Sequence, residues 1–499
     1  MNIHDTPHAP VAFDNTYARL PERFYARLAP TPVREPRLVR VNEALARDMG
    51  LDPEWLSSKE GIEVLAGNRV PDGADPIAMA YAGHQFGTWV PQLGDGRAIL
   101  LGEVVGGDGV RRDLQLKGAG QTPFSRMGDG RAWLGPVLRE YVVSEGMAAL
   151  GIATTRALAA VTTGEDVVRE QAFPGAVLAR VARSHVRVGT FQFFAARRDT
   201  EALRFLADYV IDRHYPETKT ADEPYRALLA AVIESQARLV ARWQLVGFIH
   251  GVMNTDNMSV AGETIDYGPC AFMDTYHPQT VYSSIDHMGR YAYVNQPGIA
   301  QWNLAVLAQS LLPLLAEDDE AAISKAQEAI NMFPALFKTA YLSGMRAKLG
   351  LQEEDEGDEE LVQDLLDRMA TGNCDFTLLF RRLSDVFLDD AVSRQSVRDL
   401  FTKPDLADDW LEKWAARVSG EGHEESDRRA AMRAVNPVYI PRNHLVEEVI
   451  AAAVREDDFK PFEQLLDVLS SPFKERPGLE RYTLPPRPEE VVHQTFCGT

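Results

Sequence analysis

The sequence has few cysteines and no long apolar run, and both absences narrow the kinds of protein that it can encode. Its 499 residues include three cysteines, Cys270, Cys374 and Cys497, too few for a disulfide scaffold and typical of a reducing compartment. No apolar run approaches the roughly 20 residues of a membrane span. The start of the chain lacks the basic and apolar regions of a signal peptide. We therefore expect a cytoplasmic protein without a membrane partner.

The chain also has fewer basic than acidic residues. The chain has 52 lysines and arginines against 73 aspartates and glutamates, a net charge of −21. This balance argues against a general nucleic-acid surface, although it leaves room for a local basic pocket that holds a nucleotide. The hydrophobic content of 45% with 25% charged residues is ordinary for a globular protein. The length suffices for two or three domains, or for one large elaborated domain.

The most informative absence is that of an aspartate at position 252. A kinase-like site carries H-x-D-x-x-x-x-N followed by D-F-G, in which the first Asp accepts a hydroxyl proton and the Asn and second Asp hold the metal. His250 and Asn257 have this spacing, and Asp266 begins an Asp-Tyr-Gly sequence, but position 252 is valine. The metal-holding residues are present without the usual base. The chain is therefore either inactive or catalyses a different reaction.

The distribution of strand and helix patterns predicts an α+β, protein-kinase-like fold of two lobes. We expect an N-terminal wrapping segment (1–89), a nucleotide-binding small lobe (90–190), a helical large lobe with the catalytic and metal-binding loops (191–315), and a helical C-terminal extension with a tail (316–499).

Within these regions, periodicity and turn residues place individual elements. Strands are expected at 98–105 and 113–117, a second hairpin at 166–183 around Phe173-Pro174-Gly175, and helices near 39–50, 75–83, 131–150, 200–214, 224–247, 303–316, 320–349 and 359–372. The acidic run at 353–360 is expected to be a solvated loop.

A lysine and a glutamate in the small lobe have the arrangement of a nucleotide-gripping ion pair. Lys117 ends the strand at 113–117, and Glu140 lies on the following helix. In kinases such a strand lysine holds the nucleotide phosphates and is locked by a helix glutamate. Most such pairs are surface charges, but the 250–268 segment downstream favours the ion pair.

Three glycine-rich pieces could bring backbone amides close to phosphates. They are residues 94–97 (GDGR), 118–120 (GAG) and 128–131 (GDGR), and none fits a known phosphate-loop pattern. Each alone is more typical of a turn. The repetition of Gly-Asp-Gly-Arg on both sides of Lys117 favours the phosphate-binding role.

Two arginines and one aspartate complete the candidate site. Arg180 and Arg187 could grip a terminal phosphate with their forked guanidinium groups; the alternative is a pair of solvent-facing arginines. Asp256, beside Asn257, is the substitute for the base missing at Val252; the alternative is that it only orients the loop. Asn257 and Asp266 offer the oxygen ligands that Mg²⁺ or Mn²⁺ prefers. His84 and His185 are expected to be packing or hydrogen-bonding residues.

Together these residues resemble the selenoprotein O family, whose bacterial members carry Cys where some eukaryotic ones carry selenocysteine. The similar segments span nearly the whole chain: 80–87 (AYAGHQFG), 92–98 (QLGDGRA), 116–118 (LKG), 139–141 (REY), 250–257 (HGVMNTDN), 266–269 (DYGP), 289–293 (GRYAY) and 496–499 (FCGT).

The resemblance implies a kinase-like fold that binds ATP flipped, so that AMP is transferred to Ser, Thr or Tyr hydroxyls of proteins and pyrophosphate leaves. It implies Asp256 as the base, Asn257 and Asp266 as metal ligands, and ATP contacts at Gly94, Gly96, Arg97, Lys117, Asp129, Gly130, Arg180, Arg187 and Asp266. Three alternatives remain open: UMP transfer from UTP with Mn²⁺, ordinary phosphotransfer, and a catalytically dead pseudokinase scaffold.

One departure from the family concerns redox control. Many bacterial relatives have a Cys shortly after the Asp-Tyr-Gly segment, whereas this chain has Tyr282 at the corresponding position. The family's disulfide to the tail is therefore in doubt for Cys497, unless Cys270 replaces the missing partner.

Overall fold

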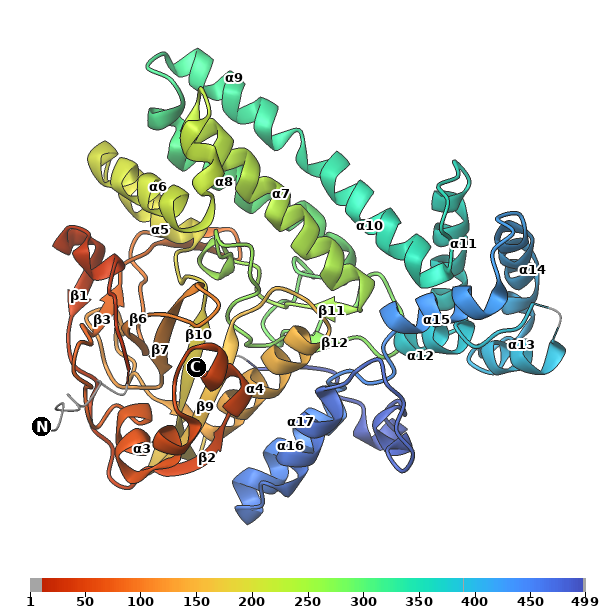
Figure 1. Cartoon of the computed structure of the whole chain (residues 1–499), viewed down its shortest axis with the longest axis horizontal. Coiled ribbons are helices and arrows are strands. Elements are labelled where there is room, and N and C mark those ends of the chain that lie inside the picture. Colours follow the sequence, from red (N-terminus) through yellow and green to blue (C-terminus); the bar gives the residue numbers. More distant parts are fainter. Residues whose placement is uncertain (1–10, 389, 497–499) are drawn as a thin grey trace, which may run out of the picture.

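The structure, a computed structural model, describes residues 11–388 and 390–496. Its main sheet is antiparallel and eight-stranded, with the order β1-β3-β6-β7-β10-β9-β2 and with β8 paired to β10 (Figure 1). Two small two-stranded sheets, the hairpin β4–β5 and the pair β11–β12, lie outside it. The strands are β1 (Tyr25–Arg27), β2 (Arg37–Val41), β3 (Ile77–Met79), β4 (Gly83–Gln85), β5 (Thr88–Val90), β6 (Ala98–Val105), β7 (Arg111–Lys117), β8 (Ala132–Trp133), β9 (Arg156–Val168), β10 (Ala172–Ala182), β11 (Phe248–Ile249) and β12 (Ala271–Phe272).

Helices pack beside the sheet and predominate after β10, so the fold is mixed α/β with a helical C-terminal region (Figure 1). They are α1 (Glu43–Asp48), α2 (Pro53–Ser57), α3 (Lys59–Leu65), α4 (Leu134–Ala149), α5 (Val188–Ala195), α6 (Thr200–His214), α7 (Pro224–Leu245), α8 (Gln296–Leu315), α9 (Asp319–Ile330), α10 (Phe333–Leu349), α11 (Asp358–Thr371), α12 (Phe376–Leu383), α13 (Ala391–Arg398), α14 (Asp405–Ser419), α15 (Glu425–Val435), α16 (Asn443–Glu456) and α17 (Lys460–Leu469). Short 3₁₀ turns are η1 (Tyr17–Arg19), η2 (Glu22–Phe24), η3 (Pro216–Thr220), η4 (Thr255–Asn257), η5 (Tyr293–Asn295), η6 (Glu480–Tyr482) and η7 (Pro488–Glu490).

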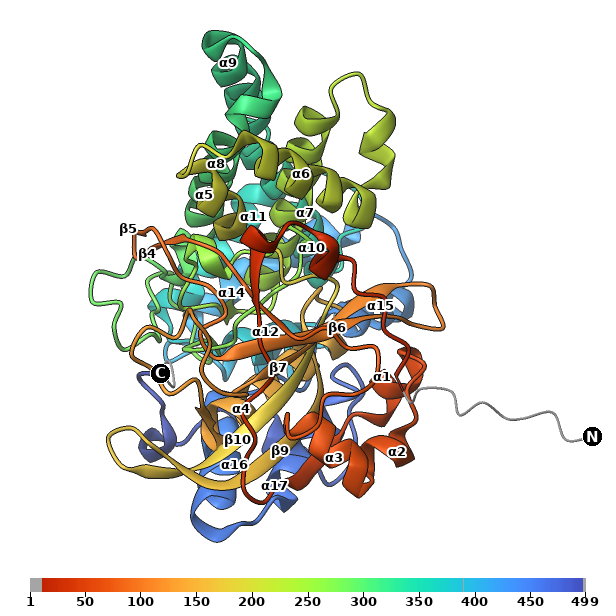
Figure 2. The ribbon, with the colours of Figure 1, turned by 90° about the vertical axis from the view of Figure 1, so that its left-hand side faces the viewer.

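The two faces of the main sheet differ because alternate residues of a strand point to opposite sides. Leu114 and Leu116 of β7 face an apolar core that includes Leu45 of α1 and Val64 of α3. Figure 2 shows these N-terminal helices beside the sheet. The opposite face of β7 carries the buried polar residues Asp113, Gln115 and Lys117. The alternation expected at 113–117 is confirmed, and it leaves one polar strip for a site.

Some expected elements are wrong in type or extent. Residues 75–83 hold β3 and the first residue of β4 instead of a helix, because Ile77–Met79 is buried between β1 and β6. The expected helix at 39–50 is β2 followed by the short α1, which Asn42 caps. In the hairpin expected at 166–183, the turn lies at 169–171. The residues around Pro174, where the turn was expected, lie inside β10 at a shift in its register with β9.

The helical region contains two further corrections. The expected helix at 320–349 is divided into α9 and α10, because Pro334 lacks the N–H needed to continue the first helix. The acidic run is not wholly solvated: Asp358 is buried and accepts from Arg417 at 2.9 Å. The neighbouring acidic residues are exposed as expected.

From the sequence we expect no apolar segment as long as a membrane span, and the helical segment Tyr293–Leu315 corrects this expectation. By length and composition alone it could cross a membrane. Leu304, Leu307 and Leu311 of this segment are instead buried in the core that α8 shares with α5 and α7. A buried core helix of a globular protein can be as long and as apolar as a membrane span. The packing of α8 in this core accounts for its apolar composition.

Candidate active site

The polar strip of the sheet meets α4 at a buried ion pair. In the β7–β10 register, Lys117 lies opposite Leu178 and Gln115 opposite Arg180, so these side chains share one face. Lys117 Nζ lies 2.5 Å from Glu140 Oε2, and Arg180 Nε lies 2.6 Å from Glu140 Oε1. All three charged side chains are buried. Burial alone would raise the pKa of Glu140, but Arg180 and Lys117 hold it below its ordinary value.

Asp266 extends this ion pair to the large helical region. Its Oδ1 lies 2.9 Å from Arg180 Nη2 and its Oδ2 lies 2.8 Å from Arg187 Nη1. Partial burial would raise the pKa of Asp266, but these arginines hold it well below its usual range. The backbone of Asp266 has a φ of 62°, a strained conformation for a residue with a side chain. A continuous chain of charges therefore runs from Lys117 through Glu140, Arg180 and Asp266 to Arg187, and we call it the ion-pair chain.

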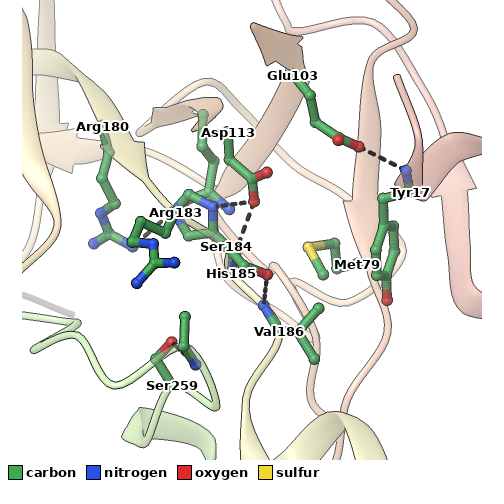
Figure 3. A network of polar contacts seen from close by, with 12 residues as sticks. Tyr17, Met79, Glu103, Asp113, Arg180, Arg183, Ser184, His185, Val186 and Ser259 are labelled. Carbon is green, nitrogen blue, oxygen red and sulfur yellow. Dashed lines mark hydrogen bonds and ion pairs between the residues drawn. The ribbon is translucent and has the colours of Figure 1, made fainter. Parts of the chain in front are cut away.

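A second polar network holds the segment that precedes Arg187, and Figure 3 shows its members Asp113 and His185 side by side. Asp113 accepts hydrogen bonds from the backbone N–H of His185 and lies beside its Nδ1, both at 2.9 Å. Arg213 of α6 also pairs with Asp113 at 2.6 Å. The segment that leads from β10 to Arg187 is thus fixed to β7. His185 is the hydrogen-bonding residue that the sequence predicts, whereas the solvent-facing alternative for Arg180 and Arg187 is wrong because both are buried.

Asp256 lies next to the end of the ion-pair chain, in η4. Arg187 Nη1 donates to its backbone oxygen at 2.9 Å, and Gln85 Nε2 donates to its Oδ2 at 3.2 Å. Its Oδ1 has no hydrogen-bond partner within the described part of the chain. Burial raises the pKa of Asp256 to about 6, although Gln85 and Arg187 oppose the shift. A carboxylate with a free oxygen and a raised pKa is suited to accept a proton near neutral pH.

The β4–β5 hairpin holds the loop that carries Asp256. The backbone N–H groups of His84 and Phe86 donate to Thr255 Oγ1 at 2.7 Å and to Asn254 Oδ1 at 2.9 Å. A Cβ on Gly83 would lie 2.5 Å from Asp256 Oδ1, so only glycine permits this approach. The hairpin accounts for much of the 80–87 segment that resembles the family.

Sequence reasoning missed three residues that support the site. Gln85 orients Asp256, as described above. The Tyr81 ring lies under the Arg187 guanidinium, 4.5 Å from ring centroid to Cζ. Asp95 accepts from the backbone N–H of Met79 at 3.1 Å and from Gln115 Nε2 at 3.3 Å. All three residues lie in the segments at 80–87 and 92–98 that resemble the family, and this was the only sign in the sequence that they could matter. Their spacing along the chain does not indicate that they contact the ion-pair chain.

Asn257 and Asp266 are the residues that could hold a divalent cation. Asn257 Nδ2 donates to the Val252 backbone oxygen at 3.0 Å, which leaves Oδ1 as the ligand atom. No cluster of three or more His, Cys, Asp or Glu side chains suited to a metal occurs in residues 11–388 and 390–496. This donor set fits Mg²⁺ or Mn²⁺, since such ions are held in nucleotide sites by one or two protein oxygens and by the substrate phosphates.

Comparisons with known proteins identify the family of the chain. Residues 7–470 match the family model described as protein adenylyltransferase SelO. The chain belongs to the SelO family. The protein nucleotidyltransferase YdiU of Rhodopseudomonas palustris (strain BisB5) is 64% identical over 494 residues, which cover 99% of this chain and 100% of the relative. The proteins of the same name from Bradyrhizobium diazoefficiens and Rhizobium etli are 62% and 61% identical, and each match covers 99% of this chain and 100% or 98% of the relative. The chain is therefore an enzyme of the protein nucleotidyltransferase class.

The two Gly-Asp-Gly-Arg pieces of this SelO-family chain lie in different surroundings. A Cβ on Gly94 would meet the Phe124 ring at 2.4 Å, and one on Gly96 would meet the Phe124 backbone oxygen at 2.9 Å. The Arg97 backbone oxygen accepts from the N–H of Gly118 at 2.7 Å, next to Lys117. The first piece therefore packs under the 122–125 loop, at the start of the ion-pair chain.

In the second piece, Asp129 pairs with Arg169 at 2.7 Å and accepts from the backbone N–H of Arg131 at 2.9 Å. A Cβ on Gly130, which has a φ of 69°, would overlap the Gly120 backbone. Asp129 and Gly130 thus form a loop held by the β9–β10 turn, outside the ion-pair chain.

Cys270 is a buried thiol in the SelO-family fold. It is fully buried, its backbone oxygen accepts from Arg139 Nη1 at 3.3 Å, and burial raises the pKa of its thiol to about 12. A protonated, enclosed thiol reacts slowly in disulfide exchange, which disfavours the redox role. Cys497, its predicted partner, lies outside the described residues. Thr495 docks nearby, with its Oγ1 donating to the Pro269 backbone oxygen at 2.7 Å.

Proposed function

We propose that this chain is a metal-dependent protein adenylyltransferase with a kinase-like, two-lobed fold. It transfers AMP from ATP to Ser, Thr or Tyr hydroxyls of proteins and releases pyrophosphate. The observation that carries this proposal is the buried carboxylate of Asp256 beside the ion-pair chain, while position 252 is valine; its Oδ1 has no hydrogen-bond partner among residues 11–388 and 390–496. The same proposal places the enzyme in the cytoplasm, without nucleic-acid or membrane partners.

The ion-pair chain supplies the phosphate grip. Three buried cations, Lys117, Arg180 and Arg187, share two carboxylates, Glu140 and Asp266. ATP phosphates would take the place of Asp266 on the two arginines, since guanidinium forks bind phosphate oxygens as well as carboxylates. The family pattern adds contacts from Gly94, Gly96, Arg97, Asp129 and Gly130.

Release of Asp266 from the arginines frees it for the cation, together with Asn257. When bound, the ion would offset the negative charge of the phosphate oxygens. The strained backbone of Asp266 keeps its carboxylate at the junction of β10 and the 250–268 segment. Binding of the nucleotide and of the cation are therefore expected to depend on each other.

In the transfer itself, Asp256 accepts the proton of the acceptor hydroxyl. The hydroxyl oxygen attacks the α-phosphorus, and the bond from this phosphorus to the oxygen that bridges to the β-phosphate breaks. Pyrophosphate carries away that electron pair, while Lys117, Arg180 and Arg187 stabilise the negative charge that develops. Val252 leaves no carboxylate at the position where a γ-phosphoryl transfer would require one.

Separate labels at the α- and γ-phosphates test the proposal. We expect the chain, incubated with Mg²⁺ or Mn²⁺ and a mixture of bacterial proteins, to retain label on protein from α-labelled ATP only, and chelation with EDTA to abolish it. Retention of γ-label would sink the proposal in favour of phosphotransfer. Labelling from α-labelled UTP that exceeds labelling from ATP would replace AMP by UMP. Absence of any label with either nucleotide would favour a scaffold.

The rate of transfer should depend on the ionisation of Asp256. Its pKa of about 6 means that the base is protonated, and thus inactive, below this pH. At a saturating nucleotide concentration, the rate should rise about tenfold per pH unit below pH 6 and level off above pH 7. Initial rates of α-label transfer between pH 5 and pH 8 measure this profile. A flat profile across the range would rule out Asp256 as the base.

A further inference from the structure

The hairpin β4–β5 has Asp256 beside its open end and a second charged residue, Arg290, beside its turn. A Cβ on Gly83, the first residue of β4, would lie 2.5 Å from Asp256 Oδ1, and one on Gly87, in the turn, would lie 3.6 Å from Arg290 Cζ. Figure 2 shows this hairpin at the outer edge of the molecule. Because strand residues advance about 3.3 Å each, the carboxylate and the guanidinium are separated by roughly 10 Å.

Aromatic rings hold the Arg290 guanidinium in place. Its Cζ lies 5.0 Å from the centroid of the Trp302 ring and 5.7 Å from that of the Tyr291 ring. The Tyr291 hydroxyl donates to Asn254 Oδ1 at 2.7 Å, two positions before Asp256. Stacking on aromatic rings positions a guanidinium without neutralising its charge. Arg290 is therefore held in a fixed position relative to Asp256.

The charge of Arg290 has no counter-charge in the described part of the chain. No carboxylate there lies within ion-pair distance of its guanidinium, whose neighbours are the two rings. Asp286 is close in sequence, but its two oxygens accept from the backbone N–H groups of Arg290 and Tyr291 at 2.9 and 2.8 Å. Burial and the nearby Arg290 lower the pKa of His84, so this ring adds no charge at neutral pH. A partly exposed guanidinium without a counter-charge is suited to bind a carboxylate.

Exposed apolar side chains accompany Arg290. Met288 and Ile285, on the loop that leads to Arg290, are 92% and 57% exposed, and Trp89 of β5 is 37% exposed. The Trp89 ring lies 5.0 Å from the ring of His84, between centroids. Large apolar side chains that are exposed together mark contact surfaces for other proteins. Because the proposed reaction brings an acceptor protein to the neighbouring Asp256, the acceptor is the occupant of this surface.

We propose that Arg290 selects the acceptor protein by pairing with an aspartate or glutamate close to the acceptor hydroxyl. An extended chain covers the roughly 10 Å between Asp256 and Arg290 in about three residues, so the acidic residue lies within about four positions of the hydroxyl. Its carboxylate accepts two parallel hydrogen bonds from the guanidinium, while Met288 and Trp89 contact neighbouring apolar side chains of the acceptor. This inference rests on the proposed function and names the acceptors that the site favours.

The overall charge of the chain makes such a preference diagnostic. A net charge of −21 disfavours acidic acceptors at long range. A preference for acidic residues close to the acceptor hydroxyl therefore has to come from a local cation.

Mass-spectrometric mapping of modified sites tests the selection. The full-length chain is incubated with ATP, Mg²⁺ or Mn²⁺ and a bacterial protein extract. Residues within four positions of each modified hydroxyl are then compared with those around unmodified Ser, Thr and Tyr of the same proteins. We expect at least a threefold excess of Asp and Glu around the modified sites. Arg290→Gln should abolish this excess, Arg290→Lys should retain part of it, and Arg290→Glu should replace it by an excess of Lys and Arg. Arg455→Gln, at an exposed position of α16, is the matched control and should keep the full acidic excess.

Kinetics on one mapped acceptor protein separate selection from a structural role. Arg290→Gln should raise the KM for this acceptor at least fivefold, more than it lowers kcat, and should leave the melting temperature unchanged and the ATP affinity within about threefold. A larger change in ATP affinity with an unchanged choice of sites would assign Arg290 to the nucleotide and overturn the proposal.

The choice of sites by the unchanged chain is decisive even if a variant fails to fold. Modified sites without an acidic excess, or with the same excess in Arg290→Glu, would overturn the selection and leave the proposed function standing. Absence of any modified site would overturn the proposed function, and the selection with it.

Discussion

Asp256→Asn is expected to lower the rate of AMP transfer by about 10²–10⁴-fold, the usual contribution of a general base. The substitution preserves the size of the side chain and removes the proton-accepting oxygen, which has no partner among the residues that the structure describes. ATP affinity should change by less than about threefold, because the ion-pair chain contacts only the backbone oxygen of Asp256. Single-turnover transfer from α-labelled ATP measures the rate, and calorimetry measures the affinity.

The matched control is Asp222→Asn, at an exposed position before α7, which should transfer AMP at the unchanged rate. The two roles considered for Asp256 predict different pH profiles. If Asp256 is the base, the residual activity of Asp256→Asn loses the rise near pH 6. If Asp256 only orients the loop, the residual activity keeps that rise, and the assignment of the base is wrong.

Glu140→Gln is expected to reduce the free energy of unfolding by about 3–5 kcal/mol, because it leaves two buried cations without their shared carboxylate. Lys117 and Arg180 both contact Glu140, and the exposed fractions of their side chains are 7% and 3%. ATP affinity should fall as well, since Lys117 loses the group that holds it in place. Denaturant unfolding followed by circular dichroism measures the first effect.

Glu234→Gln is the control for this loss of charge. Glu234 pairs with Arg238 one turn along α7, and the exposed fractions of the two side chains are 45% and 71%, so the expected effect is below about 1 kcal/mol. A similar, small effect of Glu140→Gln would mean that Lys117 and Arg180 find other partners. The ion-pair chain would then not be the element that holds the sheet and α4 together.

Local pattern was enough to predict the strands at the centre of the sheet and the helix that carries Glu140. β6 occupies the expected residues 98–105, and α4 lies inside the expected 131–150. Alternation on β7 depends only on neighbouring residues, and so does the amphipathic spacing of α4. The pairing of Lys117 with Glu140 is not local, because 23 positions separate the two residues and α4 must pack against β7 to bring them together.

Patterns failed where long-range packing decides the conformation. The segment at 75–83 became strands because β1 and β6 lie on either side of it, and no periodicity within it reports these neighbours. Gln85 contacts Asp256 across 171 positions of the chain. Such a contact leaves no signal in the spacing of nearby residues.

The sequence by itself determined which chemical groups the candidate site contains: a lysine, two arginines, a glutamate, an amide, two aspartates, and no carboxylate at position 252. Only the tertiary structure decided that Asp266 lies between Arg180 and Arg187, and that one carboxylate oxygen of Asp256 has no partner in the described part of the chain. The physical reason is that residue types specify charge and hydrogen-bonding capacity, whereas burial and partners, which set the pKa of Asp256, arise when distant segments pack together.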